Sequence, residues 1–343
     1  MYTITEKLKE RFCKDFNLPI KIFAEPYFMN RLMLYDNYYH CVEKYYRFIH
    51  LVERLGGEQG YFEYYNKVKD SAITYLNENK DMLYFSKEED MSKYVVKNTG
   101  FPKHDIYRCD NDGKYFVSFD MKRGNFTALH HYNPNIVGGK NTYEEFLGMF
   151  TDEPHLLESK YVRQVIFGNV NPRRQVTYEQ YLMDKVLNDV LTYCDKVDVV
   201  YFSTDEIVVR VDKDNLKNII PKVKETVSNS CNNNINIRSE IFKLHKIEGL
   251  SGGFVKEIID GEGDLVVKCV NSLDLPFVFR KIYNLSDNEN DLVFMYEGKL
   301  AKLLEAPKIT ISQFTSKTLA DDVLENDSLN INAVSYSETH ISL

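Results

Sequence analysis

The sequence predicts an α+β protein in which helices come first and an antiparallel sheet with packed helices follows. Over residues 5–91, apolar and aromatic side chains recur at the spacing of amphipathic helices. Residues 115–120 and 197–211 instead form runs of β-branched and aromatic residues, which favour buried strands. At 343 residues, the chain is long enough for about two or three domains with sizeable cores.

Turn signals and composition suggest how the chain is divided. Asp110-Asn111-Asp112-Gly113 is a strong turn signature directly before the first strand, and it marks the first boundary. Beyond residue 306, Ser, Thr, Asn and Asp predominate, which is typical of a loosely held segment. We therefore expect a helical domain over residues 1–110, an α/β domain over 111–245, a small accessory α/β region over 246–306 and a loosely ordered tail over 307–343.

The other elements follow from local patterns. A helix is expected to begin in the segment after the first strand, and Thr142 is a good N-cap for a short helix with acidic residues in its first turn. The periodicity of residues 156–169 predicts one helix that ends at Gly168. The remaining predicted helices are residues 175–194 and 215–229, and the remaining predicted strands are residues 235–244, 265–270, 277–282 and 292–296.

Composition excludes several classes of protein. The net charge of −8 argues against general coating of nucleic acid by the whole surface, although a local basic groove is compatible with it. The six cysteines show no Cys-x-x-Cys spacing, so neither a zinc ribbon nor a disulfide framework is indicated. No apolar run reaches about 18 residues and residues 1–10 do not look like a signal peptide, so we expect no membrane partner and a cytoplasmic location.

Three segments carry the residues of a candidate site. Asp120 ends the first strand, and Asp205 and Glu206 lie at the turn of the predicted hairpin. Between them in the chain, Lys160 and Arg163 lie three residues apart and therefore on one face of a helix. Two strand-borne carboxylates are what a divalent-metal site on a sheet needs, and basic side chains neutralise substrate phosphates. The order of the segments is that of the catalytic motifs of template-directed polymerases.

These segments resemble the motifs of family A DNA polymerases over about residues 115–211. Residues 204–211 look like the third motif of that family, in which a His-Asp-Glu turn is followed by a β-branched strand, with Thr204 in the place of the His. Residues 120–131 are similar to the first motif, and residues 163–168 are similar to the basic helix of the second. The matching positions are Asp120, Phe126, Leu129, His131, Arg163, Phe167, Gly168, Asp205 and Glu206.

The resemblance implies a fold and an activity. The implied fold is a polymerase-like palm over residues 111–245, preceded by a thumb-like helical domain. The implied activity is template-directed nucleotide transfer to a 3′-hydroxyl with two Mg²⁺ (or Mn²⁺) ions, and the implied partners are a nucleic acid template and primer and nucleoside triphosphates. By the same analogy, Asp120 and Asp205 are metal ligands with Glu206 beside them, Arg163 holds the triphosphate and Phe167 stacks on the nascent base pair.

Four further residues are candidate nucleotide contacts. Asn125 stands where the family has a Glu that discriminates between sugars, and Lys160 lies one position away from the leading Arg of the second motif. Arg173 and Arg174 are cations at a helix start, where they oppose the helix dipole and would favour a bound anion nearby.

Other interpretations of the same residues stay open. A strand-end Asp is commonly a turn or cap residue, the Asp-Glu pair can be solvated turn chemistry, and the Arg pair can be a surface feature. The alternative function is a catalytically inactive, polymerase-derived nucleic-acid-binding or structural protein of phage or viral origin, which would place it in the cytoplasm of a bacterial host. In a third possibility, an unrelated globular binding protein, Asp120 and Asp205 would lie far apart.

Overall fold

Five helices form the first part of the computed structural model, which describes residues 4–103, 106–260, 264–312 and 314. The predicted helical pattern is confirmed, and the aromatic stripe is core because Tyr45 and Phe48 are buried. Thr5 caps the first helix by accepting a hydrogen bond from the Leu8 N–H, and the side chain of Asn79 caps the fifth. The helices are α1 (Glu6–Asp15), α2 (Tyr27–Tyr39), α3 (Val42–Arg54), α4 (Glu58–Glu78) and α5 (Lys80–Lys87).

The central sheet is antiparallel and open. Its order is β2-β3-β1-β4-β5-β6, and the short β9 also pairs with β4. The first four strands and the helices between them follow the βαββαβ order of a split βαβ unit. The strands are β1 (Tyr115–Met121), β2 (Val199–Phe202), β3 (Glu206–Val211), β4 (Ile237–Glu248), β5 (Phe254–Ile258), β6 (Leu265–Lys268) and β9 (Thr310–Ile311).

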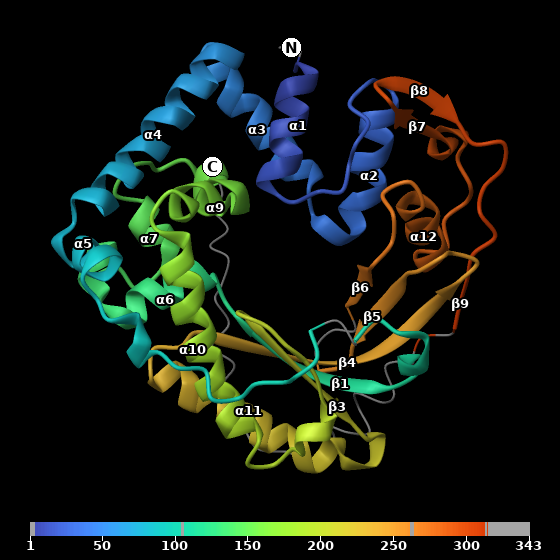
Figure 1. Cartoon of the computed structure of the whole chain (residues 1–343). Coiled ribbons are helices and arrows are strands. Elements are labelled where there is room, and N and C mark those ends of the chain that lie inside the picture. The colour runs from blue at the N-terminus through green and yellow to red at the C-terminus, as the bar shows by residue number, and fades with distance from the viewer. Residues whose placement is uncertain (1–3, 104–105, 261–263, 313, 315–343) are drawn as a thin grey trace, which may run out of the picture.

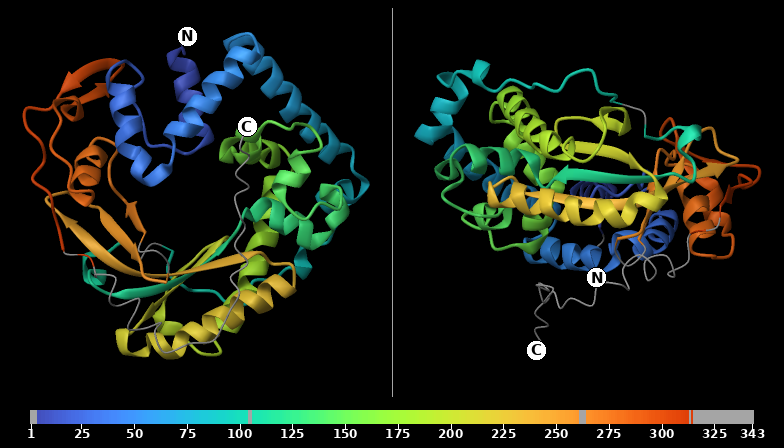
Figure 2. Two further views of the ribbon diagram at one scale, coloured as in Figure 1. Left: turned by 180° about the vertical axis from the view of Figure 1, so that it is seen from behind. Right: turned by 90° about the horizontal axis from the view of Figure 1, so that it is seen from below.

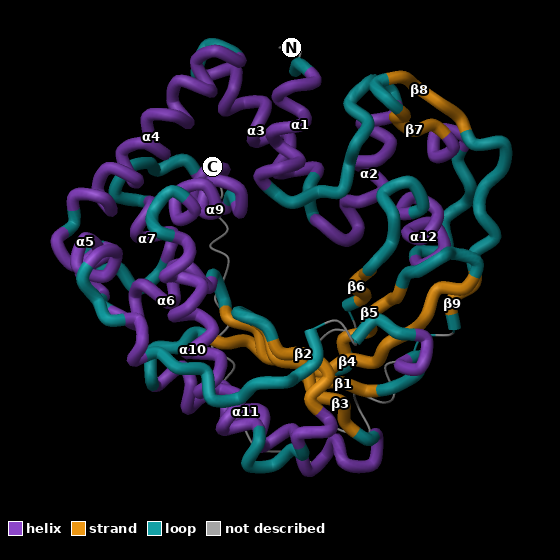
Figure 3. Tube along the Cα trace, viewed as in Figure 1, coloured by secondary structure: helices purple, strands orange, loops and turns teal. Residues whose placement is uncertain are grey.

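Two long helices cover one face of this sheet, α10 (Pro172–Val190) and α11 (Leu216–Asn232). Val117 and Phe119 of β1 belong to the large core that these helices share with the sheet. Alternate side chains of a strand point to opposite faces, so Phe116, Ser118 and Asp120 lie on the other face, which we call the inner face. Figure 3 shows the strands gathered in the lower part of the molecule, with both helices on their outer side.

Four shorter helices connect β1 to α10, and two of them replace a single predicted helix. The single helix expected over residues 156–169 is broken at Ser159 into two. The Ser159 hydroxyl accepts a hydrogen bond from the Val162 N–H at 3.0 Å and donates one to Asp15 of α1 at 2.6 Å, so the residue that caps one helix also joins it to another. These helices are α6 (Gly124–Tyr132), α7 (Tyr143–Leu147), α8 (Pro154–Glu158) and α9 (Lys160–Gly168).

The accessory region extends the central sheet. β4 continues past residue 245, and β5, which was not predicted, pairs with it in antiparallel register. The predicted strand over residues 277–282 is wrong, because this segment forms α12 (Leu275–Ile282). Pro276 lies in the first turn of α12, where it is tolerated, and Phe279 packs against Tyr35 and Tyr38 of α2.

The last described elements are short strands. β7 (Val293–Tyr296) confirms the predicted strand over residues 292–296 and pairs with β8 (Lys299–Lys302). β9 lies in the predicted tail over residues 307–343, and it pairs with Ile247 and Glu248 at the end of β4. Residues 313 and 315–343 lie outside the described residues.

The elements are arranged in a ring (Figure 1). The sheet lies across from α1–α3, with α6, α7 and α9 on one side and α12 on the other. α1 and α4 pack against α9, and α2 packs against α12, so the N-terminal helices contact both sides of the ring. In the view from below, α11 lies across the strands (Figure 2), and the inner face is therefore turned toward the middle of the ring. Within the described residues, no helix is long and apolar enough to cross a membrane.

Candidate active site

Three strands bring charged side chains together at one end of the inner face. In the antiparallel register, Asp120 of β1 lies opposite Glu206 of β3 on one side and Arg238 of β4 on the other. Directly opposed residues in antiparallel strands have side chains on the same face. The two strand-borne acids therefore converge, and a basic residue from a third strand lies beside them.

Asp205 is held at the same end of the sheet by the turn before β3. Its main-chain carbonyl accepts a hydrogen bond from the Met121 N–H at 2.8 Å, and its carboxylate accepts one from the Ser203 hydroxyl at 3.0 Å. Because Met121 follows Asp120, the turn is tied to the end of β1. The structure thus brings the three predicted catalytic acids together, although Asp120 is 85 residues from Asp205 in the chain.

The charges of these acids influence one another. Burial raises the pKa of Asp120 above its ordinary value, the Arg238 guanidinium opposes this, and the charge of Asp205 adds to it. Burial also raises the pKa of Glu206; Lys256 opposes the rise, and Asp120 reinforces it. Carboxylates that repel one another in this way are stabilised by a nearby cation.

Cations from β4, β5 and β6 already lie on this face. Nε of Arg238 is 2.7 Å from the Asp120 carboxylate, and Nζ of Lys256 is 2.6 Å from Glu240, which follows Arg238 on the same face. The charge of Lys268 opposes the rise in the pKa of Glu206 and adds to the lowering of the pKa of Glu240. Within the described ranges, no three His, Cys, Asp or Glu side chains form a ready-made metal site. Carboxylate oxygens are the hard donors that Mg²⁺ and Mn²⁺ prefer, and one of those on Asp120 is occupied by Arg238.

Sequence reasoning missed Arg238, Glu240 and Lys256. The one signal available was the alternation of polar and apolar residues in the predicted strand over residues 235–244, which places Arg238 and Glu240 on one face. Nothing local indicated that this strand pairs with β1, because strand pairing over such a distance depends on the tertiary structure.

Glu179 is a further acid that the sequence did not single out. It lies on α10, is only 5% exposed, and accepts a hydrogen bond from the Asn125 amide at 3.1 Å. A Cβ on Gly124 would lie 3.4 Å from its carboxyl carbon, so the space around this acid is narrow. Burial, and then the charge of Asp205, raise the pKa of Glu179 to about 7. Asn125, which was predicted to contact nucleotide, thus positions Glu179, and the charge of Asp205 affects the pKa of that acid.

Replacing Glu179 with Gln is expected to remove a pH dependence of stability. The pKa of about 7 lies above the ordinary value of 4.5, so burial favours the protonated acid. The contribution of Glu179 to stability is therefore largest below pH 4.5 and is lost as the pH rises through 7, by about 3 kcal/mol in total. Urea unfolding of the wild type and Glu179→Gln at several pH values between about 4.5 and 8 measures the difference.

The matched control for that experiment is Glu43→Gln, because the side chain of Glu43 is 86% exposed on α3. It removes one charge without changing a buried carboxyl group. Parallel pH profiles for the wild type and Glu179→Gln would contradict the expected result.

A second cluster contains Arg163 and lies around Tyr143 of α7. The guanidinium carbons of Arg163 and Arg123 lie 5.7 and 6.0 Å from the centre of the Tyr143 ring, and Arg123 also pairs with Glu144. The Tyr143 hydroxyl and Nε of Arg163 are buried without a hydrogen-bond partner among the described residues. Burial, and then the nearby Arg123, act to lower the pKa of Arg163. Two arginines and two donors that lack a described hydrogen-bond partner therefore gather around one buried tyrosine.

Two predicted nucleotide contacts have other roles. The Phe167 side chain is fully buried against Tyr143 and Phe146, so it is not available to stack on a base pair. The Arg174 guanidinium donates hydrogen bonds to the carbonyl oxygens of Phe85 and Glu89 at 2.8 and 2.7 Å, so it joins α10 to the end of α5. The predicted stacking role of Phe167 is corrected to a core role, and the anion-binding role of Arg174 to a structural one.

Lys160 and Arg173 are both exposed, at the first turn of α9 and the first turn of α10. Neither shares a described ion pair with the cluster around Tyr143. Of the four predicted basic contacts, Arg163 is therefore the one placed among groups that lack hydrogen-bond partners.

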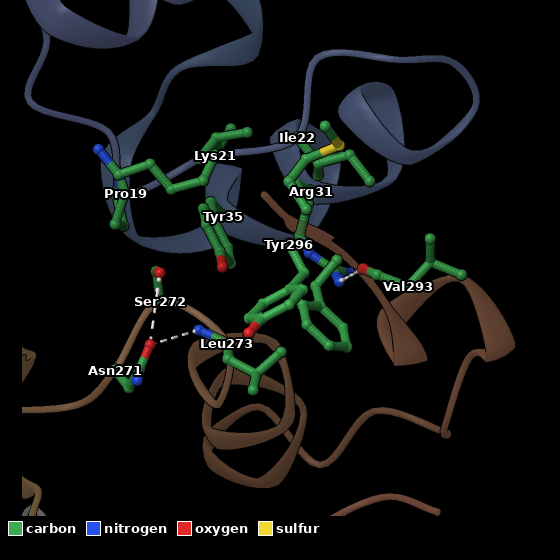
Figure 4. A pocket seen from close by; sticks show the side chains of 13 residues that line it. Pro19, Lys21, Ile22, Arg31, Tyr35, Asn271, Ser272, Leu273, Val293 and Tyr296 are labelled. Carbon is green, nitrogen blue, oxygen red and sulfur yellow. Dashed lines mark hydrogen bonds between the residues drawn. The ribbon is translucent and has the colours of Figure 1, made fainter. Parts of the chain in front are cut away.

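Three cavities in the described part of the chain lie away from the acids. One of about 230 Å³ lies between α2 and the segments flanking α12, and Lys21, Arg31 and Tyr35 are among its lining residues (Figure 4). The others lie beside His155 and beside Asp198. None of the three contains a residue of the predicted site. The candidate site is therefore defined by the acids that converge on the open inner face of the sheet, and not by the size of a cavity.

The fold and this face define a class of α+β protein, with a split βαβ sheet that carries acids at one end of its inner face. Comparisons of the chain with protein-family models, with curated proteins and with solved structures gave no match. The function is therefore inferred from the residues of this chain.

Proposed function

We propose that the protein is a template-directed nucleotidyltransferase with a polymerase-like palm, which adds nucleotides to a 3′-hydroxyl. The observation that carries this proposal is the convergence of Asp120, Asp205 and Glu206 at one end of the inner face. Their residue types and their order in the chain match the resemblance to family A DNA polymerases. The βαββαβ order, in which the end of β1 meets the turn between β2 and β3, supports the same proposal.

The proposed reaction is phosphoryl transfer. The 3′-oxygen of a primer bonds to the α-phosphorus of a nucleoside triphosphate, the bond from that phosphorus to the bridging oxygen breaks, pyrophosphate leaves, and the hydroxyl proton passes to water. Two bound divalent cations would assist both the attacking and the leaving oxygen. Asp120, Asp205 and Glu206 would hold these cations with their carboxylate oxygens.

The cluster around Tyr143 supports a triphosphate as the substrate group. Arg123 is three residues beyond Asp120, and Asn125, two residues further on, donates a hydrogen bond to Glu179, whose pKa the charge of Asp205 raises. The cationic cluster and the acids are therefore linked through neighbouring residues of α6. A triphosphate that reached this cluster would offer acceptor oxygens to the Tyr143 hydroxyl and to Nε of Arg163, and Arg123 could turn to it from Glu144.

The direct test is incorporation by the purified full chain. Primed DNA and primed RNA templates would be offered with deoxy- and ribonucleoside triphosphates in Mg²⁺ or Mn²⁺, and primer extension would be measured on gels. We expect extension that stops when EDTA is added. Absence of extension with every template, nucleotide and metal, combined with retained binding to nucleic acid, would favour the inactive nucleic-acid-binding alternative, which the pairing of Arg238 with Asp120 also favours.

Replacing Arg163 with Gln is expected to weaken nucleotide use. Loss of a charge-assisted contact of about 1.5 to 3 kcal/mol corresponds to a fall in kcat/KM of roughly 10- to 100-fold. Titration of inorganic tripolyphosphate by calorimetry measures the same contact without turnover. Arg173→Gln is the matched control, because Arg173 is an exposed arginine at the first turn of α10. A larger effect of Arg173→Gln than of Arg163→Gln would contradict the assignment.

A further inference from the structure

Arg238 has two acidic partners on the inner face. Its Nε lies 2.7 Å from Oδ2 of Asp120, which is opposite it in register, and its Nη1 lies 3.8 Å from Oε1 of Glu240, two residues along β4. The Arg238 side chain is 53% exposed, whereas those of Asp120 and Glu240 are 27% and 28% exposed. The cationic group is therefore the more accessible member of this set, and it can move between two fixed acids.

Glu240 is held in place independently of Arg238. Nζ of Lys256 lies 2.6 Å from Oε2 of Glu240, and the same ammonium group lies 4.2 Å from the centre of the Phe242 ring. The Lys256 side chain is 7% exposed. Glu240 thus remains a partner for Arg238 whether or not Asp120 is engaged.

A divalent cation on Asp120 and the Arg238 guanidinium compete for the same oxygen. Nε of Arg238 binds Oδ2, so a divalent cation held by the Asp120 carboxylate would repel the guanidinium and take its acceptor. Breaking the contact with Arg238 accordingly reduces the apparent affinity of Asp120 for a cation.

We infer that Arg238 is an internal counter-ion of the acid cluster, which leaves Asp120 and stays on Glu240 when a divalent cation binds. This inference rests on the proposed function, because it assumes that Asp120 is a metal ligand. Arg238 is a positioning residue in this arrangement. It neutralises Asp120 when no cation is bound, and it makes metal binding depend on a shift between two acids.

Binding of Mn²⁺ to the full chain, followed by electron paramagnetic resonance of the free ion, tests the inference without turnover. Arg238→Gln is expected to lower the Mn²⁺ dissociation constant by roughly 2- to 5-fold, which corresponds to the loss of one partly exposed ion pair. Lys268→Gln is the matched control. Lys268 is a cation on the same face, but the hydrogen bond to Asp120 comes from Arg238. An equal effect of both substitutions would overturn the inference in favour of simple loss of positive charge.

A double-mutant cycle with Glu240→Gln separates the two-partner arrangement from simple electrostatics. Glu240→Gln removes the alternative partner of Arg238, so we expect it to weaken Mn²⁺ binding several-fold in the wild type and clearly less in Arg238→Gln. Additive effects of the two substitutions would overturn the inference. If neither the wild type nor Arg238→Gln binds Mn²⁺ at millimolar concentration, the proposed metal site fails as well. If the wild type binds it and Arg238→Gln binds no more tightly, only the inference fails.

Discussion

Replacing Asp120 or Asp205 with Asn is expected to reduce nucleotide incorporation by roughly three orders of magnitude. A carboxylate that holds a catalytic cation contributes several kcal/mol to transition-state stabilisation, and each 1.4 kcal/mol corresponds to about a tenfold change in rate. Asn keeps the shape of the side chain but lacks the negative charge. The steady-state rate of primer extension at saturating nucleotide and metal measures the loss.

Stability is expected to change little in these two variants. Asp205 is exposed, and the Asp120 pair with Arg238 is partly exposed, with Arg238 at 53%, so loss of the pair costs about 1 kcal/mol or less. Asp198→Asn is the matched control, because Asp198 is a half-buried acid before β2 that pairs with Arg210 instead. Incorporation by Asp120→Asn or Asp205→Asn within tenfold of the wild type would refute the assignment of these acids as metal ligands.

Replacing Asp15 with Ala is expected to lower the free energy of unfolding by about 3 to 5 kcal/mol, as loss of one member of a buried charged network does. Asp15 is fully buried and contacts Nε of Arg11 at 3.0 Å, Nε2 of His155 at 3.0 Å and the Ser159 hydroxyl at 2.6 Å. The network joins α1 to α8 and α9. In Asp15→Ala, Arg11 and His155 stay buried but lose their acidic partner, which destabilises the folded state.

The pH dependence of this effect follows from the pKa of Asp15. Burial acts to raise that pKa, but the contacts with His155 and Arg11 hold it below the ordinary value of 3.8. The stabilisation is therefore complete above pH 3.8 and is lost as the pH falls through the lowered pKa. Denaturant unfolding near neutral pH gives the full difference between Asp15→Ala and the wild type, and the difference shrinks in acid.

Glu10→Ala is the control for the Asp15 experiment. Glu10 lies on the same helix and pairs with Lys14, and their side chains are 47% and 54% exposed, so its loss is expected to cost about 0.5 kcal/mol or less. Equal destabilisation by Glu10→Ala and Asp15→Ala would show that the buried network does not join these helices in the way described.

Local sequence patterns predicted the elements that carry the acids. β1 and the β2–β3 hairpin are continuous runs of residues suited to buried strands, so their burial and their turns follow from composition over a few residues. The helix predicted over residues 156–169 ends at Gly168 as expected but is broken at Ser159, and the strand predicted over 277–282 was wrong. Both differences have reasons outside those segments. Ser159 begins a new helix while donating to Asp15, and Phe279 is held in a helix that packs on α2.

The roles of individual basic and aromatic residues were harder to predict. Helical spacing placed Lys160 and Arg163 on one side of a helix but did not decide how deeply each would lie. Phe167 is buried because α9 packs its apolar side against α7, and Arg174 is used by carbonyl oxygens at the end of α5. These outcomes depend on neighbours that are distant in sequence.

By itself, the sequence determined that this protein has a helical first part and a strand and a hairpin with acids at their ends, because such patterns depend on neighbouring residues. Only the tertiary structure decided that Asp120 opposes Glu206 and that Arg238 from β4 lies between these acids and Glu240. The reason is that strand register is set when one face of the whole sheet is buried, which here requires α10 and α11 to pack on it.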